Sequence, residues 1–161
     1  MILVSSCLAG QTVRYNGTHS LNAGIRAEVE AGRAAAVCPE LLGGFVTPRE
    51  PAEIVGGGGD DVLDGRARVI EISGADVTEL YLRGARLTLE KARELGAHTV
   101  VLKENSPSCG SAEIYNGAFD GTKAAGHGVT TALLRRHGIT VLSEHNYRES
   151  LNHSTKGERQ A

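Results

Sequence analysis

The sequence predicts an α/β fold: a single domain, three-layer-like, built around a mainly parallel sheet. Short apolar runs typical of buried strands alternate with stretches of helical periodicity, which favours a parallel sheet with helices on its faces. The chain has only three cysteines, and each closes one of these strand-like segments: Cys7, Cys38 and Cys109. Because parallel strands open their carboxyl ends into one crevice, we expect the three thiols to meet there.

The first half of the chain contains the elements that are hardest to predict. After the strand at residues 2–7, a helix is expected from Asn22, which can cap it, to Gly32, which can end it. The strand at residues 34–38 leads to residues 40–53, whose prolines and glycines predict an ordered loop over the strand ends. Further on, the sequence predicts a turn at residues 56–61 and a short extra strand at 66–72.

The second half of the chain has clearer periodicity. Leucines and alanines recur at helical spacing from Asp76 until Gly96, which predicts one long amphipathic helix. Residues 98–103 predict a core strand. A helix is then expected at residues 130–137, and a last strand at 139–142.

Length and composition predict one domain. A chain of 161 residues with 40% hydrophobic content can bury one sizeable core. We expect the domain to span residues 1–143, followed by a polar tail at 144–161 that frays because it has no apolar face.

The charge balance and the first residues restrict partners and location. With 17 basic and 19 acidic residues, the chain lacks the positive charge typical of proteins held by nucleic-acid phosphates, so nucleic acid is not an expected partner. Neither a basic leader nor a long apolar segment opens the sequence, which predicts no membrane span and a cytoplasmic protein with free thiols.

The cysteines are candidate ligands of a metal or cluster. An odd number of thiols argues against a fully paired disulfide framework. Three protein ligands around a four-position centre leave one position open for substrate, which favours catalysis over a structural site. The alternative is that the cysteines are simply small buried apolar residues, and these patterns alone do not distinguish iron from zinc.

Residues next to the cysteines are candidates for acid/base catalysis and for orienting a substrate or a water. Glu40 follows Cys38 and the rigid Pro39, so its carboxylate is a candidate acid/base. Ser106 and Ser108 lie beside Cys109, where hydroxyls can orient a substrate or a water. Alternatively, Glu40 pairs with an arginine and the serines are turn residues.

The start of the helix after residue 126 and the histidines are weaker evidence of function. Residues 126–131 open a helix with amides suited to an anion, or form only a helix entry. The six histidines share no metal-ligand spacing, so none is predicted to be a ligand.

Several blocks of the sequence resemble the thiouracil desulfidase family, from residue 1 to about residue 143. They are residues 5–10, 13–17, 37–40, 43–44, 47–49, 102–103 and 106–110. The sequence departs from the family pattern at Ala9, where leucine is frequent, and at Asn16, where aspartate is common. Neither position is a proposed ligand, although Asn16 could alter substrate contacts.

The resemblance implies a cofactor and a reaction. It implies an oxygen-sensitive [4Fe-4S] cluster held by Cys7, Cys38 and Cys109, with one iron lacking a protein ligand. The sulfur of a thiolated uracil would bind that iron and water would replace it, without net redox chemistry, while Glu40 handles protons with Ser106 nearby. The products would be uracil, or UMP from a nucleotide, and hydrosulfide.

The resemblance also implies a small thiolated pyrimidine as substrate: 2-thiouracil, 4-thiouracil or 4-thiouridine monophosphate. Longer relatives with a further carboxyl-terminal domain act on thiolated transfer RNA, so we expect a base or mononucleotide here. A phosphate would be bound by Arg14, Arg49, Lys103 or the amides around Gly128. Two other function classes remain open: an iron-sulfur carrier or redox sensor without catalysis, and a zinc-dependent hydrolase.

Overall fold

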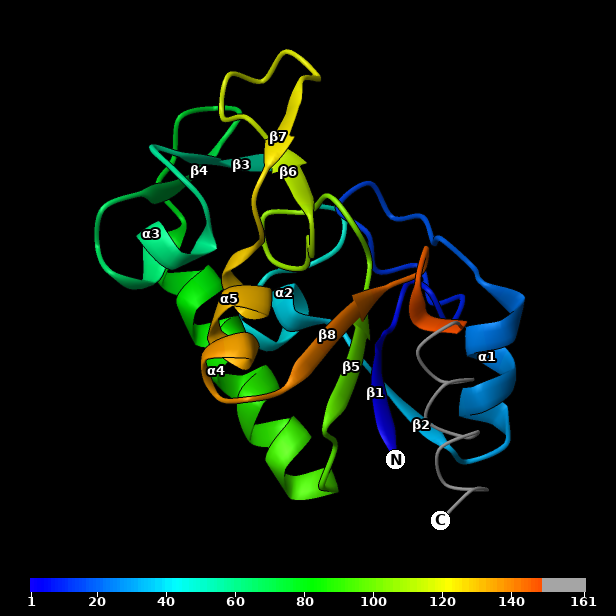
Figure 1. Ribbon diagram of the computed structural model, residues 1–161. Coiled ribbons are helices and arrows are strands. Elements are labelled where there is room, and N and C mark those ends of the chain that lie inside the picture. Colours follow the sequence, from blue (N-terminus) through cyan, green and yellow to red (C-terminus); the bar gives the residue numbers. More distant parts are fainter. Residues whose placement is uncertain (149–161) are drawn as a thin grey trace.

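The computed structural model describes residues 1–148 and confirms the predicted α/β class. Its central sheet has four parallel strands in the order β2 (Ala34–Val37), β1 (Ile2–Ser5), β5 (Thr99–Leu102) and β8 (Thr140–Ser143). Figure 1 shows α1 (Ala23–Glu30) on one face, and α4 (Thr78–Leu95) and α5 (Val129–Arg136) on the other. These are the three layers that the strand–helix alternation predicts.

Side chains of the central strands alternate between two cores. Leu3 and Val100 pack with α4 and α5, whereas the adjacent Val4 and Val101 pack with Ile25 of α1. This two-residue period is that of strands buried on both faces, and it explains their nearly continuous apolar sequence.

The predicted helix boundaries are close to those observed. The side chain of Asn22 accepts a hydrogen bond from Ile25 N (3.1 Å) and starts α1. Before α4, the carboxylate of Asp76 accepts from Thr78 N at 3.0 Å. Gly96 ends α4 in the left-handed conformation, with φ 64°.

The loop predicted at residues 40–53 is wrong in part. It contains a short helix, α2 (Pro39–Leu42), and a strand, β3 (Ala52–Val55). Pro39 occupies the first helical position, where its missing N–H costs nothing, so this proline starts a helix. The turn predicted at 56–61 likewise gives way to α3 (Gly59–Leu63), whose first turn is stabilised because Gly58 N donates to the carboxylate of Asp61.

Two antiparallel hairpins lie beside the main sheet. The predicted extra strand is β4 (Arg68–Glu71), which pairs with β3. The sequence did not predict the second hairpin, β6 (Glu113–Tyr115) and β7 (Lys123–Ala125), because strands of three residues are too short to show a period. This hairpin is fixed from a distance: the buried carboxylate of Glu53 accepts from Gly117 N at 2.9 Å.

Helix α2 lies directly against α4 through two glycines. A Cβ at Gly84 would overlap the carbonyl oxygen of Pro39, and a Cβ at Gly43 would overlap that of Leu80. Gly84 therefore allows the backbone of α2 to touch α4. Because α2 immediately follows Cys38, this contact also fixes the carboxyl end of β2.

The first residues of the predicted polar tail pack against the domain. Tyr147 is 4% exposed, and its hydroxyl donates to the side chain of Asn22 at 3.1 Å. The rest of the predicted tail, from residue 149 on, lies outside the described residues, and the domain boundary stays a prediction. Within residues 1–148, no helix combines the length and the apolar character needed to cross a bilayer.

We predict that Gly84→Ala lowers the free energy of unfolding by about 1–3 kcal/mol, because the new methyl group forces α2 away from α4. Alanine usually stabilises a helix interior relative to glycine by about 1 kcal/mol, so the sign is diagnostic. Urea unfolding measures the change, with Arg86→Ala at an exposed position of α4 as the control. A more stable Gly84→Ala variant would contradict the proposed close contact.

Candidate functional site

The site lies where the order of strands reverses. From β1 the chain passes through α1 to β2 on one side, whereas the next strand of this sheet, β5, lies on the other side of β1. Open α/β sheets bind ligands outside the carboxyl ends of the strands at such a point. Cys7 follows β1, and the loop that carries Cys109 follows β5.

A cavity of about 300 Å³ opens at this edge of the sheet. It brings together seven of the ten predicted site residues: Cys7, Arg14, Glu40, Arg49, Lys103, Ser106 and Cys109. The volume is at the lower end of the range for ligand pockets, which suits a single aromatic ring more than a polymer.

Burial and nearby negative charge raise the pKa values of the three thiols. Burial and the neighbouring Cys38 raise the pKa of Cys7 to about 11. Burial also raises the pKa of Cys109, and so do the charges of Glu40, Cys38 and Cys7. Burial again raises the pKa of Cys38, with a further contribution from Glu40. Cys38 thus acts electrostatically on both other thiols, although it is outside the cavity lining.

The three thiols are the type of donor that iron-sulfur clusters use. All three are free cysteines rather than members of a disulfide. Within the described chain, no three His, Cys, Asp or Glu side chains lie close enough together to hold a single metal ion. A [4Fe-4S] cluster needs a wider arrangement, because each thiolate binds a different iron, and thiolates are its usual ligands.

Glu40 is held by Arg49 inside the cavity. Arg49 Nε donates to Glu40 Oε2 at 2.7 Å, and the side chains of Arg49 and Glu40 are only 7% and 12% exposed. The rest of the guanidinium donates to Val13 O and Thr47 Oγ1. The pairing with an arginine, considered above as the alternative to a catalytic role, is therefore present. In the described chain, Glu40 Oε1 has no hydrogen-bond partner, which leaves it available to water or substrate.

The loop after β5 uses its two serines differently. Ser106 Oγ accepts from Cys109 N at 2.8 Å, so its own O–H remains available to the cavity. Ser108 is buried outside the cavity lining and shares a 2.9 Å hydrogen bond with Thr130 of α5. The geometry favours a structural role for Ser108 over a role in substrate binding.

The amides around Gly128 already have partners. Gly128 N donates to Gly110 O, Val129 N to Pro107 O, and Thr130 N to Ser108 O. A Cβ at Gly128 would overlap the backbone of Ser108. These groups pack the start of α5 on the cysteine loop, so they do not form the anion site that the sequence suggested.

The other two cations of the predicted phosphate site differ in their partners. Lys103 Nζ lies 2.8 Å from the carboxylate of Glu144, which neutralises it. Arg14 lines the cavity next to the exposed Tyr15, and no hydrogen bond or ion pair within residues 1–148 occupies its guanidinium. Arg14 is therefore the cation that a phosphate can reach without displacing another partner.

The comparisons with known proteins agree with this geometry. The family model described as 2-thiouracil desulfurase matches residues 2–146. The chain belongs to this 2-thiouracil desulfurase family. It is 58% identical over 151 residues to YbbK, an uncharacterised protein of Bacillus subtilis (strain 168), covering 94% of this chain and 100% of that protein. The solved structure of a [4Fe-4S]-dependent thiouracil desulfidase, TudS, is similar with 47% identity and a TM-score of 0.83, covering 96% of this chain and 97% of the other.

The buried carboxylate of Glu104 organises the cysteine loop of this desulfurase-family chain, a role that was not predicted from the sequence. It accepts from the amides of Asn105, Ser111, Ala112 and Glu113, and from the Ser111 hydroxyl. Burial acts to raise the pKa of Glu104, but the hydrogen bonds, led by that of Ser111, outweigh it and lower the pKa. A lone glutamate after a strand carries no sequence signal of this role.

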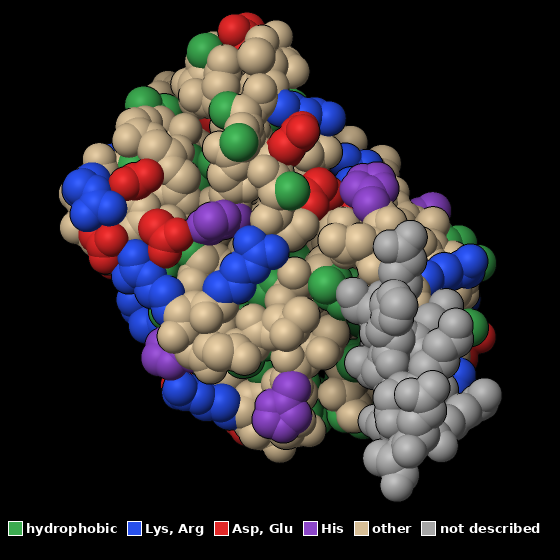
Figure 2. Space-filling view, in the orientation of Figure 1, with side chains coloured by type: hydrophobic (Ala, Val, Ile, Leu, Met, Phe, Trp, Pro, Cys, Tyr) green, Lys and Arg blue, Asp and Glu red, His purple; other side chains and the backbone are tan. Residues whose placement is uncertain are grey.

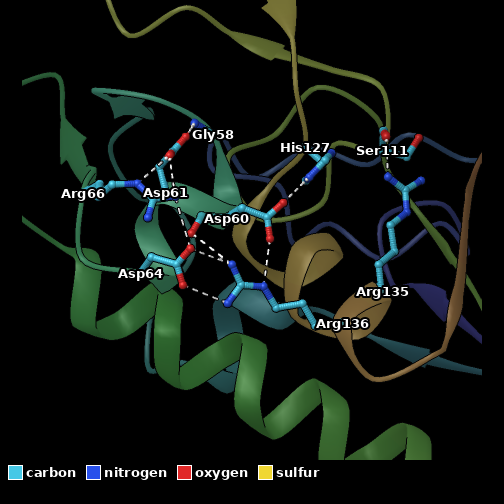
Figure 3. Close-up of polar contacts among 9 residues, drawn as sticks. All are labelled: Gly58, Asp60, Asp61, Asp64, Arg66, Ser111, His127, Arg135 and Arg136. Atoms are coloured by element: carbon cyan, nitrogen blue, oxygen red, sulfur yellow. Dashed lines mark hydrogen bonds and ion pairs between the residues drawn. The ribbon is translucent and has the colours of Figure 1, made fainter.

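A network of ion pairs joins α3 to both ends of α5. Figure 3 shows the carboxylate of Asp60 between His127 Nε2 (2.7 Å) and Arg136 Nε (2.9 Å). Arg136 also donates two hydrogen bonds to Asp64. Charged side chains of both signs lie side by side over this region in Figure 2. The network holds the helix whose first turn supports the Cys109 loop.

We predict that Glu104→Ala lowers the free energy of unfolding by roughly 2–3 kcal/mol, because buried amides lose their acceptor. In the metal-free protein, Cys109 should then react faster with a thiol reagent, since its loop is no longer held. Urea unfolding and a thiol-labelling time course measure the two effects. Glu90→Ala, at an exposed position of α4, is the control; labelling at the wild-type rate would contradict the role of Glu104.

Proposed function

We propose that this protein removes sulfur from a thiolated uracil, as free base or nucleotide, by a non-redox hydrolysis that releases hydrosulfide. The observation that carries the proposal is the cavity in which Cys7 and Cys109 meet Glu40 and Ser106, at a strand-order reversal in a chain of the 2-thiouracil desulfurase family. The [4Fe-4S]-dependent similar structure supports the choice of cofactor.

Cys7, Cys38 and Cys109 would hold a [4Fe-4S] cluster. When bound, this cluster supplies an iron position without a protein ligand, a soft Lewis acid that favours a thiocarbonyl sulfur over an oxygen. The thiols fit this role because burial raises the pKa values of all three, and neighbouring thiols raise those of Cys7 and Cys109 further. Ionising all three is favourable only when a positive group shares them, which supports binding of a cationic cluster.

Glu40 would manage the protons of the reaction. Arg49 holds the Oε2 atom, and Oε1 can take a proton from water as the water oxygen attacks the ring carbon. The carbon–sulfur bond then breaks, and the carbon-bound hydroxyl loses its remaining proton and becomes the carbonyl. Glu40 passes its proton to the leaving sulfur, which departs as hydrosulfide, and the second proton of the water is released to solvent. No electrons are gained or lost. The free O–H of Ser106 can orient the water or the substrate.

The substrate would be a small molecule: 2-thiouracil, 4-thiouracil or 4-thiouridine monophosphate, giving uracil or UMP. The size of the cavity supports a single base in its interior. If the substrate carries a phosphate, we assign its binding to Arg14, because Arg49 and Lys103 are already paired with carboxylates. A cytoplasmic location, where thiols stay reduced, is part of the proposal.

The decisive experiment is anaerobic reconstitution followed by turnover. We predict that the protein binds iron and labile sulfide and releases hydrosulfide from a thiouracil over many cycles, whereas Cys7→Ala, Cys38→Ala and Cys109→Ala each lose most of the iron. Iron, zinc and sulfide are quantified together. Cluster binding without turnover would support an iron-sulfur carrier or sensor instead, and turnover with zinc alone would support a hydrolase.

We predict that Glu40→Gln retains the cluster but lowers kcat on the order of 100-fold or more, because glutamine still accepts from Arg49 but takes no proton. Anaerobic kinetics together with iron content separate the two effects. Glu90→Gln, on the exposed face of α4, serves as the control. Wild-type turnover in Glu40→Gln would remove Glu40 from the mechanism.

We predict that Arg14→Ala lowers kcat/KM for 4-thiouridine monophosphate roughly tenfold or more but leaves that for 4-thiouracil unchanged, because only the nucleotide offers a charged acceptor. The comparison of the two substrates supplies an internal control, and Arg86→Ala supplies a second one. An equal change for both substrates would show that Arg14 does not bind phosphate.

A further inference from the structure

Tyr81 is a buried residue of the cavity that the mechanism above does not use. It belongs to the first turns of α4, is only 4% exposed, and lines the cavity with Glu40 and Cys109. Its ring packs against that of Phe45 in an edge-to-face arrangement, with the centroids 5.1 Å apart.

The Tyr81 hydroxyl has no protein partner. In residues 1–148 no hydrogen bond to it is found, yet every fully buried side-chain nitrogen or oxygen there has a partner. The hydroxyl must therefore retain some access from the cavity. Tyr147, equally buried at 4% exposure, shows the usual arrangement, because its hydroxyl donates to Asn22. A ligand in the cavity is the natural partner for the Tyr81 hydroxyl.

The surroundings favour a donating hydroxyl. Burial, and the nearby negative charge of Glu40, raise the pKa of Tyr81, so the phenol keeps its proton. Cys109 and Arg49 also act on this group, which places the hydroxyl among the groups that would surround a substrate ring. A neutral O–H in such a place recognises a neutral oxygen acceptor.

We propose that the Tyr81 hydroxyl donates a hydrogen bond to the carbonyl oxygen that remains on the thiolated pyrimidine, and so selects rings that carry both a thiocarbonyl and a carbonyl. The inference rests on the proposed function. Two groups would then recognise the substrate. The bound cluster would select the thiocarbonyl sulfur, and the Tyr81 hydroxyl would bind the carbonyl oxygen. A buried donor left without an acceptor discriminates against rings that lack this oxygen.

The test combines a variant with a substrate that lacks the carbonyl. For the isomer that the enzyme turns over, 4-thiouracil is compared with pyrimidine-4-thione, or 2-thiouracil with pyrimidine-2-thione. Tyr81→Phe should lower kcat/KM for the thiouracil about three- to tenfold, the size expected for one neutral hydrogen bond, and leave that for the thione unchanged or higher, because the thione offers this hydroxyl no acceptor. Equal losses on both substrates, or no loss, would overturn the inference.

Binding of uracil gives a second readout without turnover. Calorimetry should show uracil binding weakened by a similar three- to tenfold in Tyr81→Phe, with iron content unchanged. Tyr147→Phe removes a hydroxyl of the same kind outside the cavity and controls for stability. If the wild-type protein releases no hydrosulfide, the proposed function fails; if it does and Tyr81→Phe behaves like wild type on every substrate, only the role of Tyr81 fails.

Discussion

The parallel pairing of β2, β1 and β5 places the segments that carry three thiols at one edge of the sheet. The position is electrostatically unfavourable for thiolates, since burial and the neighbouring charge of Glu40 raise the pKa values of both Cys38 and Cys109. Without a cation the three groups remain neutral thiols. A cationic cluster bound by these thiols would reverse this preference, so its binding would be coupled to the release of their protons.

Such a site must be held together by contacts that do not depend on the cofactor. The chain provides a different support for each of two cysteine segments. Backbone contact at Gly84 fixes the helix that follows Cys38, and the carboxylate of Glu104 gathers the amides around Cys109. These supports act on the backbone, where they leave the sulfur atoms free. Preorganisation of this kind limits the entropy lost when ligands close around a metal centre.

The parts of the molecule that the sequence predicted are those in which local signals agree with the final structure. Apolar runs gave the four central strands, and Asn22 and Gly96 marked helix ends. The hairpin of β6 and β7 is bonded to Glu53, and Asp60 of α3 to His127; both partners are distant in sequence, so no local pattern shows these contacts. The partners of Glu104 lie only one to nine residues further along the chain, but a single glutamate forms no pattern that predicts its role. At Gly128 a local pattern instead predicted a site that is not formed. The glycine before a helix is typical of an anion site, but the amide of Gly128 already donates a hydrogen bond to Gly110 O in the cysteine loop.

The distribution of charge in the cavity bears on how a substrate would enter. Four carboxylates belong to its lining: Glu40, Glu50, Glu53 and Glu104. Of the three cations there, Arg49 and Lys103 are already paired with carboxylates, which leaves Arg14 beside the exposed Tyr15. An acidic interior repels a phosphate but accepts a neutral ring, because the ring carries no charge to oppose. A nucleotide would therefore enter base first, with its phosphate kept near Arg14 and its ring directed toward Glu40 and the thiols.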